Sequence, residues 1–312
     1  MRSPSSVSAG GAAVVVIVGA SGVLGSRVVQ RVLDDGSSVR AVSRDPDRLV
    51  AAAARGAEVV RGDLLETGWE EGALAGAERL VIAAHGLVPP SRRNTPMAVD
   101  GVGARRLIDA AAAAGVRQVV YLSAAGAASE ATAFGRVKRA TERHLEASGA
   151  PWTVIRPSVF PENHALVLLG APVRAGKPVP FFGAGEERIN WVSADDVADD
   201  VVRCLDDDAT LGTVREVRGR DHLSRREALE LVEAELGVQA RRQHLPVGVV
   251  KVLRGATRAL HPGLHALLDL SMHEIERGGD PEDEPERATW VGSTRVADVV
   301  GAWVREGAAT AT

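Results

Sequence analysis

The stretch Gly19-Ala20-Ser21-Gly22-Val23-Leu24-Gly25 decides the fold of this chain of 312 residues. It follows residues 14–18 (VVVIV), a continuous β-branched run that predicts a strand buried on both faces. It leads into residues 22–34, in which apolar side chains recur at helical spacing. A glycine-rich turn between a strand and a helix suits a dinucleotide, because the turn admits the pyrophosphate and the helix N-terminus attracts it. The stretch therefore predicts a dinucleotide-binding strand–turn–helix unit.

Each glycine of this motif has a separate steric task. Gly19 permits the tight turn, Gly22 lets the backbone approach a pyrophosphate, and Gly25 lets the helix pack closely on the strand. The alternative is a glycine-rich turn without a ligand, but the strand before it and the helix after it favour binding. The residues predicted to contact the cofactor here are Gly19, Ser21, Gly22, Val23, Leu24 and Gly25.

Strands and helices alternate along the first half of the chain. This alternation predicts an α/β fold with a Rossmann-type, doubly wound parallel sheet, joined to a small C-terminal substrate or cap domain. The predicted strands are residues 14–18, 39–43, 58–61, 80–84, 118–123, 152–156, 189–193 and 213–218. The predicted helices are residues 22–34, 47–55, 99–114, 134–148, 194–205, 224–236 and 245–277, the last broken near Pro262.

The change of pattern after residue 157 predicts the domain organisation. Residues 12–157 with about 189–220 are expected to form the dinucleotide-binding domain, and about 158–188 with 221–305 the smaller domain. Residues 1–11 are expected to be a flexible tail. The acidic, proline-containing residues 278–287 are expected to be a mobile loop.

Composition narrows the class of protein. The net charge of −4 gives no basic field that would attract nucleic acid or an anionic membrane, so we expect a small molecule as the partner. The oligomeric state is left open. Cys204 is the only cysteine, which excludes a disulfide framework and favours the reducing cytoplasm. His261, His265 and His273 are poorly phased for a shared ligand, so no metal is predicted.

Several stretches together resemble the short-chain dehydrogenase/reductase superfamily, and in particular its atypical NmrA-like branch. The G-x-x-G-x-x-G spacing at 19–25 and the sequence VRGDL at 60–64 are similar to superfamily motifs. The sequences TVIRPSVFPEN at 153–163 and NWVSADDVA at 190–198 resemble stretches of the NmrA-like branch. The resemblance covers about residues 13–220.

This resemblance implies a nicotinamide dinucleotide as the cofactor. Arg44 ends the second predicted strand, where an acidic residue would bind the ribose 2′-hydroxyl of NAD and an arginine suits the 2′-phosphate of NADP. We therefore predict NADP, with NAD as the alternative because Asp45 is adjacent. By resemblance, four further residues would contact the adenosine: Asp63 and Leu64 at the adenine, and Ala83 and Ala84 at the ribose.

The resemblance also implies a Y-x-x-x-K pair, in which the tyrosine transfers a proton and the lysine binds the nicotinamide ribose. Here the stretch is Phe134-Gly135-Arg136-Val137-Lys138, so standard tyrosine catalysis is not expected. The only tyrosine, Tyr121, lies in a predicted strand and is expected in the core or at the sheet edge. Lys138 is predicted to bind cofactor and to be catalytic, because a buried lysine can give up its proton. The alternative is an ion pair with Glu142.

Two further residues are catalytic candidates. Ser123 could polarise a substrate carbonyl, or its hydroxyl could cap backbone instead. His164 could be a general acid, or a structural histidine. Aromatic residues gather within 158–191, which suits an apolar pocket, although a small-domain core would show the same composition. The predicted substrate pocket consists of Phe160, Asn163, His164, Phe181 and Trp191.

Together these features predict an NADP-dependent oxidoreductase that reduces a small carbonyl or enone compound without the usual catalytic tyrosine. One alternative is a non-catalytic NAD(P)-binding sensor or scaffold of NmrA-like type. Another is a non-redox isomerase or cyclase on the same fold. The missing tyrosine favours the alternatives, whereas the retained lysine favours the reductase.

Overall fold

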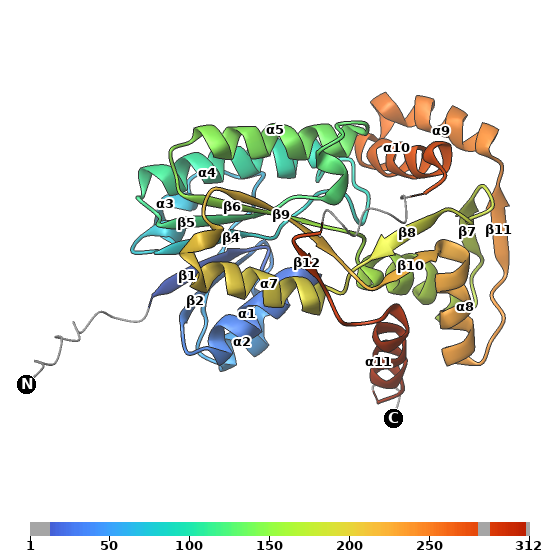
Figure 1. Cartoon of the computed structure of the whole chain (residues 1–312), viewed down its shortest axis with the longest axis horizontal. Helices are drawn as coiled ribbons and strands as arrows, with labels where there is room; N and C mark the ends of the chain where they lie inside the picture. The colour runs from blue at the N-terminus through green and yellow to red at the C-terminus, as the bar shows by residue number, and fades with distance from the viewer. Residues whose placement is uncertain (1–12, 280–287, 310–312) are drawn as a thin grey trace, which may run out of the picture.

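The computed structural model describes residues 13–279 and 288–309 (Figure 1). The predicted tail at 1–11 and most of the predicted loop at 278–287 therefore lie outside the described residues. A parallel eight-stranded sheet forms the centre of the molecule, which confirms the predicted Rossmann-type α/β fold. In spatial order its strands are β12 (Trp290–Val291), β9 (Thr213–Arg218), β6 (Trp152–Pro157), β5 (Gln118–Leu122), β4 (Arg79–Ile82), β1 (Val14–Val18), β2 (Ser38–Ser43) and β3 (Glu58–Arg61).

Helices cover both faces of this sheet (Figure 1). One face carries α1 (Val23–Asp34), α2 (Val50–Ala54) and α7 (Ala194–Asp206). The other carries α3 (Glu70–Leu74), α4 (Ala104–Ala113) and α5 (Ala133–Ala147). A π-helical segment, Met97–Gly103, precedes α4, and short 3₁₀ turns lie at Pro46–Leu49, Ala125–Ala127 and Asp208–Thr210.

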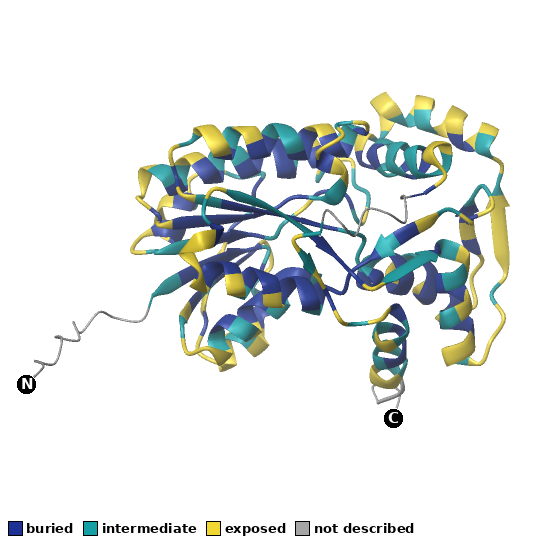
Figure 2. Cartoon of the chain, in the orientation of Figure 1, coloured by how far each residue is buried: buried dark blue, intermediate teal, exposed yellow. Residues whose placement is uncertain are grey.

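The β-branched run of β1 shows why the strand lies in the middle of the sheet. Side chains alternate across a strand, so neighbouring residues enter different cores. Val15 and Ile17 pack with α1 and α7, whereas Val16 and Val18 pack with α4 and α5. All four side chains are buried, and Figure 2 shows the same for most of the central strands.

A second group of elements lies beside the sheet. β8 (Arg188–Trp191) pairs antiparallel with β10 (Asp221–Ser224), and β7 (Val179–Phe182) pairs parallel with β11 (Arg242–Leu245). The remaining helical elements are the π-helical segment Glu162–Gly170, α6 (Ala171–Arg174), α8 (Arg225–Leu236), α9 (Val247–Leu260), α10 (Pro262–Arg277) and α11 (Val296–Ala309). Among the described residues, no helix combines the length and apolar character that crossing a bilayer requires.

The strand predicted at 189–193 corresponds to β8, which pairs with β10 outside the central sheet. Its alternate residues Ile189 and Trp191 pack into a separate core with α8 and α11. The sequence also did not predict β12, a two-residue strand that extends the central sheet beside β9. The division into two domains stays a prediction.

Candidate functional site

A cavity of about 1210 Å³ lies at the carboxyl ends of the central strands. The strand order reverses between β1 and β4, and this is where open α/β sheets bind their ligands. The cavity continues from the glycine turn to residues after β5 and β6. It brings together most of the predicted site residues: Gly19, Ser21, Gly22, Val23, Leu24, Arg44, Asp63, Leu64, Ala83, Ala84, Ser123, Lys138, Phe160, Asn163 and His164.

The three motif glycines differ in what surrounds them. Gly19 has a φ of +86°, and a Cβ there would lie 2.7 Å from the backbone nitrogen of Ala84. A Cβ on Gly25 would collide with the carbonyl oxygen of Gly19, so this residue supports the packing of α1 and does not line the cavity. Gly22 lines the cavity and begins α1 with no side-chain cap. The first N–H groups of α1 therefore remain available to an anionic ligand.

Three arginines surround a recess at the β2 end of the cavity. Arg44 follows β2, Arg48 lies one turn further on, and Arg93 comes from the segment after β4. Within the described part of the chain, none of their guanidinium groups forms an ion pair or a side-chain hydrogen bond. Asp45 and Asp63 line the same recess. The recess thus offers three cations to a phosphate, and Arg93 among them is not predicted from the sequence.

Lys138 lies on α5 with its ammonium group buried beside Asp100. Nζ is 2.7 Å from Asp100 Oδ1 and donates to the carbonyl oxygen of Leu122 at 2.6 Å. The predicted alternative, an ion pair with Glu142, is wrong, because that carboxylate binds Arg156. Burial alone would lower the pKa of Lys138, but the Asp100 carboxylate outweighs it and raises this pKa. The lysine is held charged, contrary to the expectation that burial would release its proton.

The two aromatic rings near Lys138 offer no replacement for the missing tyrosine hydroxyl. Lys138 Nζ lies 4.8 Å from the centroid of Tyr121 and 5.6 Å from that of Phe134. Tyr121 is fully buried in the core and does not line the cavity. Of the two predicted positions, core and sheet edge, it therefore takes the first. Burial raises the pKa of its phenol to about 12.

Ser123 is engaged by a buried carboxylate. Its hydroxyl lines the cavity and donates to Glu142, which also accepts from Arg156 at 2.6 Å. Burial opposes ionisation of Glu142, but the hydrogen bonds from Arg156 and Ser123 keep its pKa below the ordinary value. A serine hydroxyl has one proton, so Ser123 in this arrangement has none to offer a substrate oxygen. The geometry argues against both its predicted role at a carbonyl and its predicted backbone cap.

His164 lies in the segment Glu162–Gly170 with its ring edge-on to Trp191, at 6.5 Å between centroids. Burial lowers the pKa of His164 to about 3, and the charges of Arg225 and His85 act in the same direction. The ring is therefore neutral at neutral pH. Since a general acid must hold a transferable proton at the working pH, this environment argues against the predicted role.

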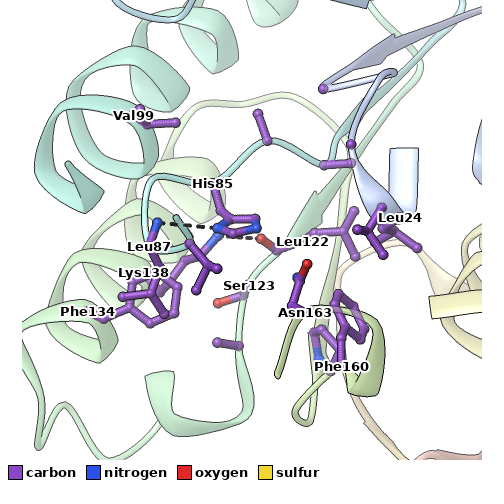
Figure 3. A pocket seen from close by; sticks show the side chains of 18 of the residues that line it. Leu24, His85, Leu87, Val99, Leu122, Ser123, Phe134, Lys138, Phe160 and Asn163 are labelled. Carbon is purple, nitrogen blue, oxygen red and sulfur yellow. Dashed lines mark hydrogen bonds between the residues drawn. The ribbon is translucent and has the colours of Figure 1, made fainter. Parts of the chain in front are cut away.

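Two predicted pocket residues are core residues instead. Phe181 and Trp191 are 2% and 1% exposed, and neither lines the cavity. Both belong to the core formed with α8 and α11, and the indole of Trp191 donates to the carbonyl oxygen of Leu223. The prediction of Phe181 and Trp191 as substrate-pocket residues is therefore wrong. Phe160 and Asn163 do line the cavity, and Figure 3 shows them side by side.

Two contributions to the cavity wall are not predicted from the sequence. His85, three residues after β4, lines the cavity, and its position at the carboxyl end of a strand beside the reversal point could have indicated this. One face of α10 also lines it, at the helical spacing i, i+3, i+4 and i+7. That face consists of Leu270, His273, Glu274 and Arg277.

Comparison with known proteins places this geometry in context. The family model described as NAD(P)H-binding matches residues 19–208. The NAD(P)H azoreductase of Xenophilus azovorans is 28% identical over 225 residues, which are 72% of this chain and 74% of that protein. The (4-alkanoyl-5-oxo-2,5-dihydrofuran-3-yl)methyl phosphate reductase of Streptomyces griseus is 31% identical over 268 residues, 85% and 88% of the two chains.

Solved structures share the fold. The NADPH-dependent quinone oxidoreductase QOR2 of Escherichia coli, complexed with NADPH, superposes with a TM-score of 0.71 at 24% identity. The match covers 93% of this chain and 99% of that one. At this level of identity the likeness extends to the fold alone.

Proposed function

Because the chain belongs to the NAD(P)H-binding family, we propose that it is an NADP(H)-dependent reductase of a small carbonyl or enone compound. The observation that supports this most is one continuous cavity. It joins the glycine turn, Arg44 and Arg48 to the apolar walls around Phe160. A dinucleotide and a second molecule therefore share one space. The two relatives named as reductases support the same reaction class.

The cavity fits a phosphorylated dinucleotide. The uncapped start of α1 would hold the pyrophosphate, and Gly22 leaves space for it. Arg44 and Arg48, joined by Arg93, would hold a 2′-phosphate, which favours NADP over NAD. When bound, the nicotinamide supplies a hydride. The remaining proposed cofactor contacts are Ser21, Val23, Leu24, Asp63, Leu64, Ala83, Ala84 and Lys138, with Gly19 and Gly25 shaping the turn.

Lys138 would position the cofactor rather than transfer a proton. An ammonium group has three donors, and Asp100 and Leu122 occupy two of them. Lys138 also lines the cavity, so its charged ammonium group would lie beside the ribose of a dinucleotide bound there. The raised pKa of Lys138 supports a fixed cation at this place.

The part of the cavity beyond Lys138 favours an uncharged, largely apolar acceptor. Its walls come from the loop after β4, the segment after β6, and α10. Pockets of this kind bind small molecules by apolar contact and a few polar groups that fix orientation. The apolar lining residues are Leu87, Val88, Pro89, Phe134, Val159, Phe160, Val167 and Leu270.

Two measurements test the proposal. Calorimetry should show tighter binding of NADPH than of NADH, and absorbance of the reduced nicotinamide should fall only when an aldehyde, quinone or enone is added. Arg117→Ala is the matched control, because Arg117 is exposed, pairs with Glu78 and lies outside the cavity. Equal affinity for both dinucleotides would contradict the NADP preference.

A cofactor-binding sensor or scaffold is the second candidate. Phe134 at the tyrosine position and the engaged hydroxyl of Ser123 favour it, because both remove proton donors that the superfamily pattern implies. Tight NADPH binding without oxidation by any acceptor would support this candidate and contradict the reductase.

A further inference from the structure

His85 is a hydrogen-bonding side chain of the cavity that the family resemblance does not assign. It follows β4, and its side chain is exposed on the cavity wall. In Figure 3 its ring is drawn between Lys138 on one side and Asn163 and Phe160 on the other. His85 therefore lines the region proposed for the acceptor.

The turn that carries His85 is held by buried groups. The backbone N–H of Gly86 donates to Asp100 Oδ2 at 2.8 Å, and the other oxygen of Asp100 faces Lys138. A Cβ on Gly86 would lie 2.6 Å from the backbone of Thr95, so this turn packs closely on its neighbour. The ion pair beneath the cavity thus also fixes the position of His85.

The local hydrogen bond defines which ring nitrogen of His85 carries the proton. The backbone N–H of Leu87 donates to Nδ1 at 3.3 Å. A ring nitrogen that accepts a hydrogen bond has no proton, so the neutral ring carries its proton on Nε2. Protein atoms around the cavity wall desolvate the His85 ring and lower its pKa; the charge of Asp100 opposes this shift, and the charge of Lys138 adds to it. The ring is therefore a neutral donor through Nε2 at neutral pH.

The other groups at the expected catalytic positions are less available to an acceptor oxygen. Phe134 has no hydroxyl, Ser123 donates to Glu142, and His164 is buried with its ring edge-on to Trp191. Lys138 is held by Asp100 and Leu122. A carbonyl that gains negative charge nevertheless needs a donor aimed at its oxygen.

We propose that His85 is the catalytic residue that donates a hydrogen bond, through Nε2–H, to the oxygen of the bound acceptor. This inference rests on the proposed reductase function. The imidazole polarises the oxygen without losing its own proton, and the oxyanion left by hydride transfer takes its proton from solvent water. His85 therefore takes over the hydrogen bond of the missing tyrosine but not its proton transfer. The ligand it recognises is a carbonyl or quinone oxygen.

Substitutions of His85 test the donor. His85→Leu should lower kcat/KM for 1,4-benzoquinone by about 10²-fold, the typical loss of one such donor. His85→Gln keeps an N–H group and should lose less than about tenfold. Both variants should bind NADPH as the wild type does by calorimetry. His144→Leu is the control, because His144 pairs with Asp109 outside the cavity. Wild-type kcat/KM in His85→Leu would overturn the inference.

Nitrogen NMR of the cofactor-free protein separates this inference from the proposed function. The His85 ring should show the Nε2-protonated tautomer, and its Nε2 resonance should shift when hydroquinone is added as an unreactive ligand. A proton on Nδ1, or an unchanged Nε2 resonance when hydroquinone binds, would overturn the inference. If none of the tested acceptors makes the wild type oxidise NADPH, the reductase function and a catalytic role for His85 both fail. The NMR result then still decides whether His85 is a donor.

Discussion

The two halves of the cavity differ in how their charged groups are used. In the half next to β2, Arg44, Arg48 and Arg93 have no side-chain partner among the described residues. In the half beyond β5, the charged groups are already paired within the protein, as in Lys138 with Asp100. The first half is therefore suited to a highly charged ligand. The second is a preformed, largely neutral surface suited to an uncharged acceptor.

Removing the partner of the buried lysine should have the largest effect on this arrangement. Asp100→Asn leaves an uncompensated ammonium group and is expected to cost about 3–5 kcal/mol of unfolding free energy. Asp100→Asn combined with Lys138→Met should recover much of it, because both charges are then gone. Urea unfolding measures both variants. A loss below about 1 kcal/mol would mean that the pair contributes no more than a surface ion pair.

Gly22→Val should abolish cofactor binding while the fold survives. Gly22 has ordinary backbone dihedral angles, and its Cβ would approach only the carbonyl oxygen of Gly19, at 3.1 Å. The side chain would instead fill the space proposed for the pyrophosphate. We expect NADPH affinity to fall at least about 100-fold, or about 2.7 kcal/mol. Gly25→Val is the contrasting variant, because it should disrupt folding. Unchanged NADPH affinity in a folded Gly22→Val variant would remove the glycine turn from the site.

These two predictions also separate what sequence could reveal from what it could not. The glycine turn and Arg44 are predictable from sequence, because their positions depend on a few consecutive residues, and both line the cavity. The partner of Lys138 was not found, because Asp100 reaches it from a different element. Phe181 and Trp191 were placed in the pocket from local composition, which does not tell which face of a strand meets a core. Whether α10 faces the cavity likewise depends on packing between distant segments.

Arg44→Ala tests whether the charged half of the cavity binds the 2′-phosphate of NADPH. A hydrogen bond between charged groups contributes about 1.5–3 kcal/mol, so NADPH affinity should fall about 10- to 100-fold. NADH affinity should stay the same, because NAD lacks the 2′-phosphate. Calorimetry with both dinucleotides measures this, with Arg117→Ala as control. An equal loss for both would show that Arg44 does not read the phosphate.

Unfolding at alkaline pH tests the raised pKa values of the two buried groups Lys138 and Tyr121. The chain has three lysines and one tyrosine, so few groups titrate in the alkaline range. The pKa values of Lys138 and Tyr121 are raised in the folded state, the latter to about 12. Above the unfolded values near pH 10, the unfolded chain therefore binds fewer protons, and stability should fall by at most about 1.4 kcal/mol per pH unit for each group. Lys138→Met should show a shallower fall in urea unfolding. The same slope in both proteins would contradict the raised pKa of Lys138.

Phe134→Tyr should have the smallest effect. If His85 already holds the acceptor oxygen, a new phenol next to Lys138 should change kcat by less than about tenfold, whereas general acid–base catalysis contributes about 10²–10⁴-fold. Steady-state kinetics with a quinone measures this. A gain of about 10²-fold or more would show that the hydrogen bond from His85 does not replace the missing tyrosine.

The transfer of deuterium tests most directly whether the two halves act together. The protein is supplied with NADPH that carries deuterium at C4 of the nicotinamide, and the product of an enone or aldehyde acceptor is analysed by mass spectrometry. A reductase of the proposed kind places one deuterium on carbon in the product, and Gly22→Val yields no labelled product. If NADPH saturates the protein and no acceptor yields a labelled product, the account is contradicted. An unlabelled, rearranged product would indicate an isomerase instead.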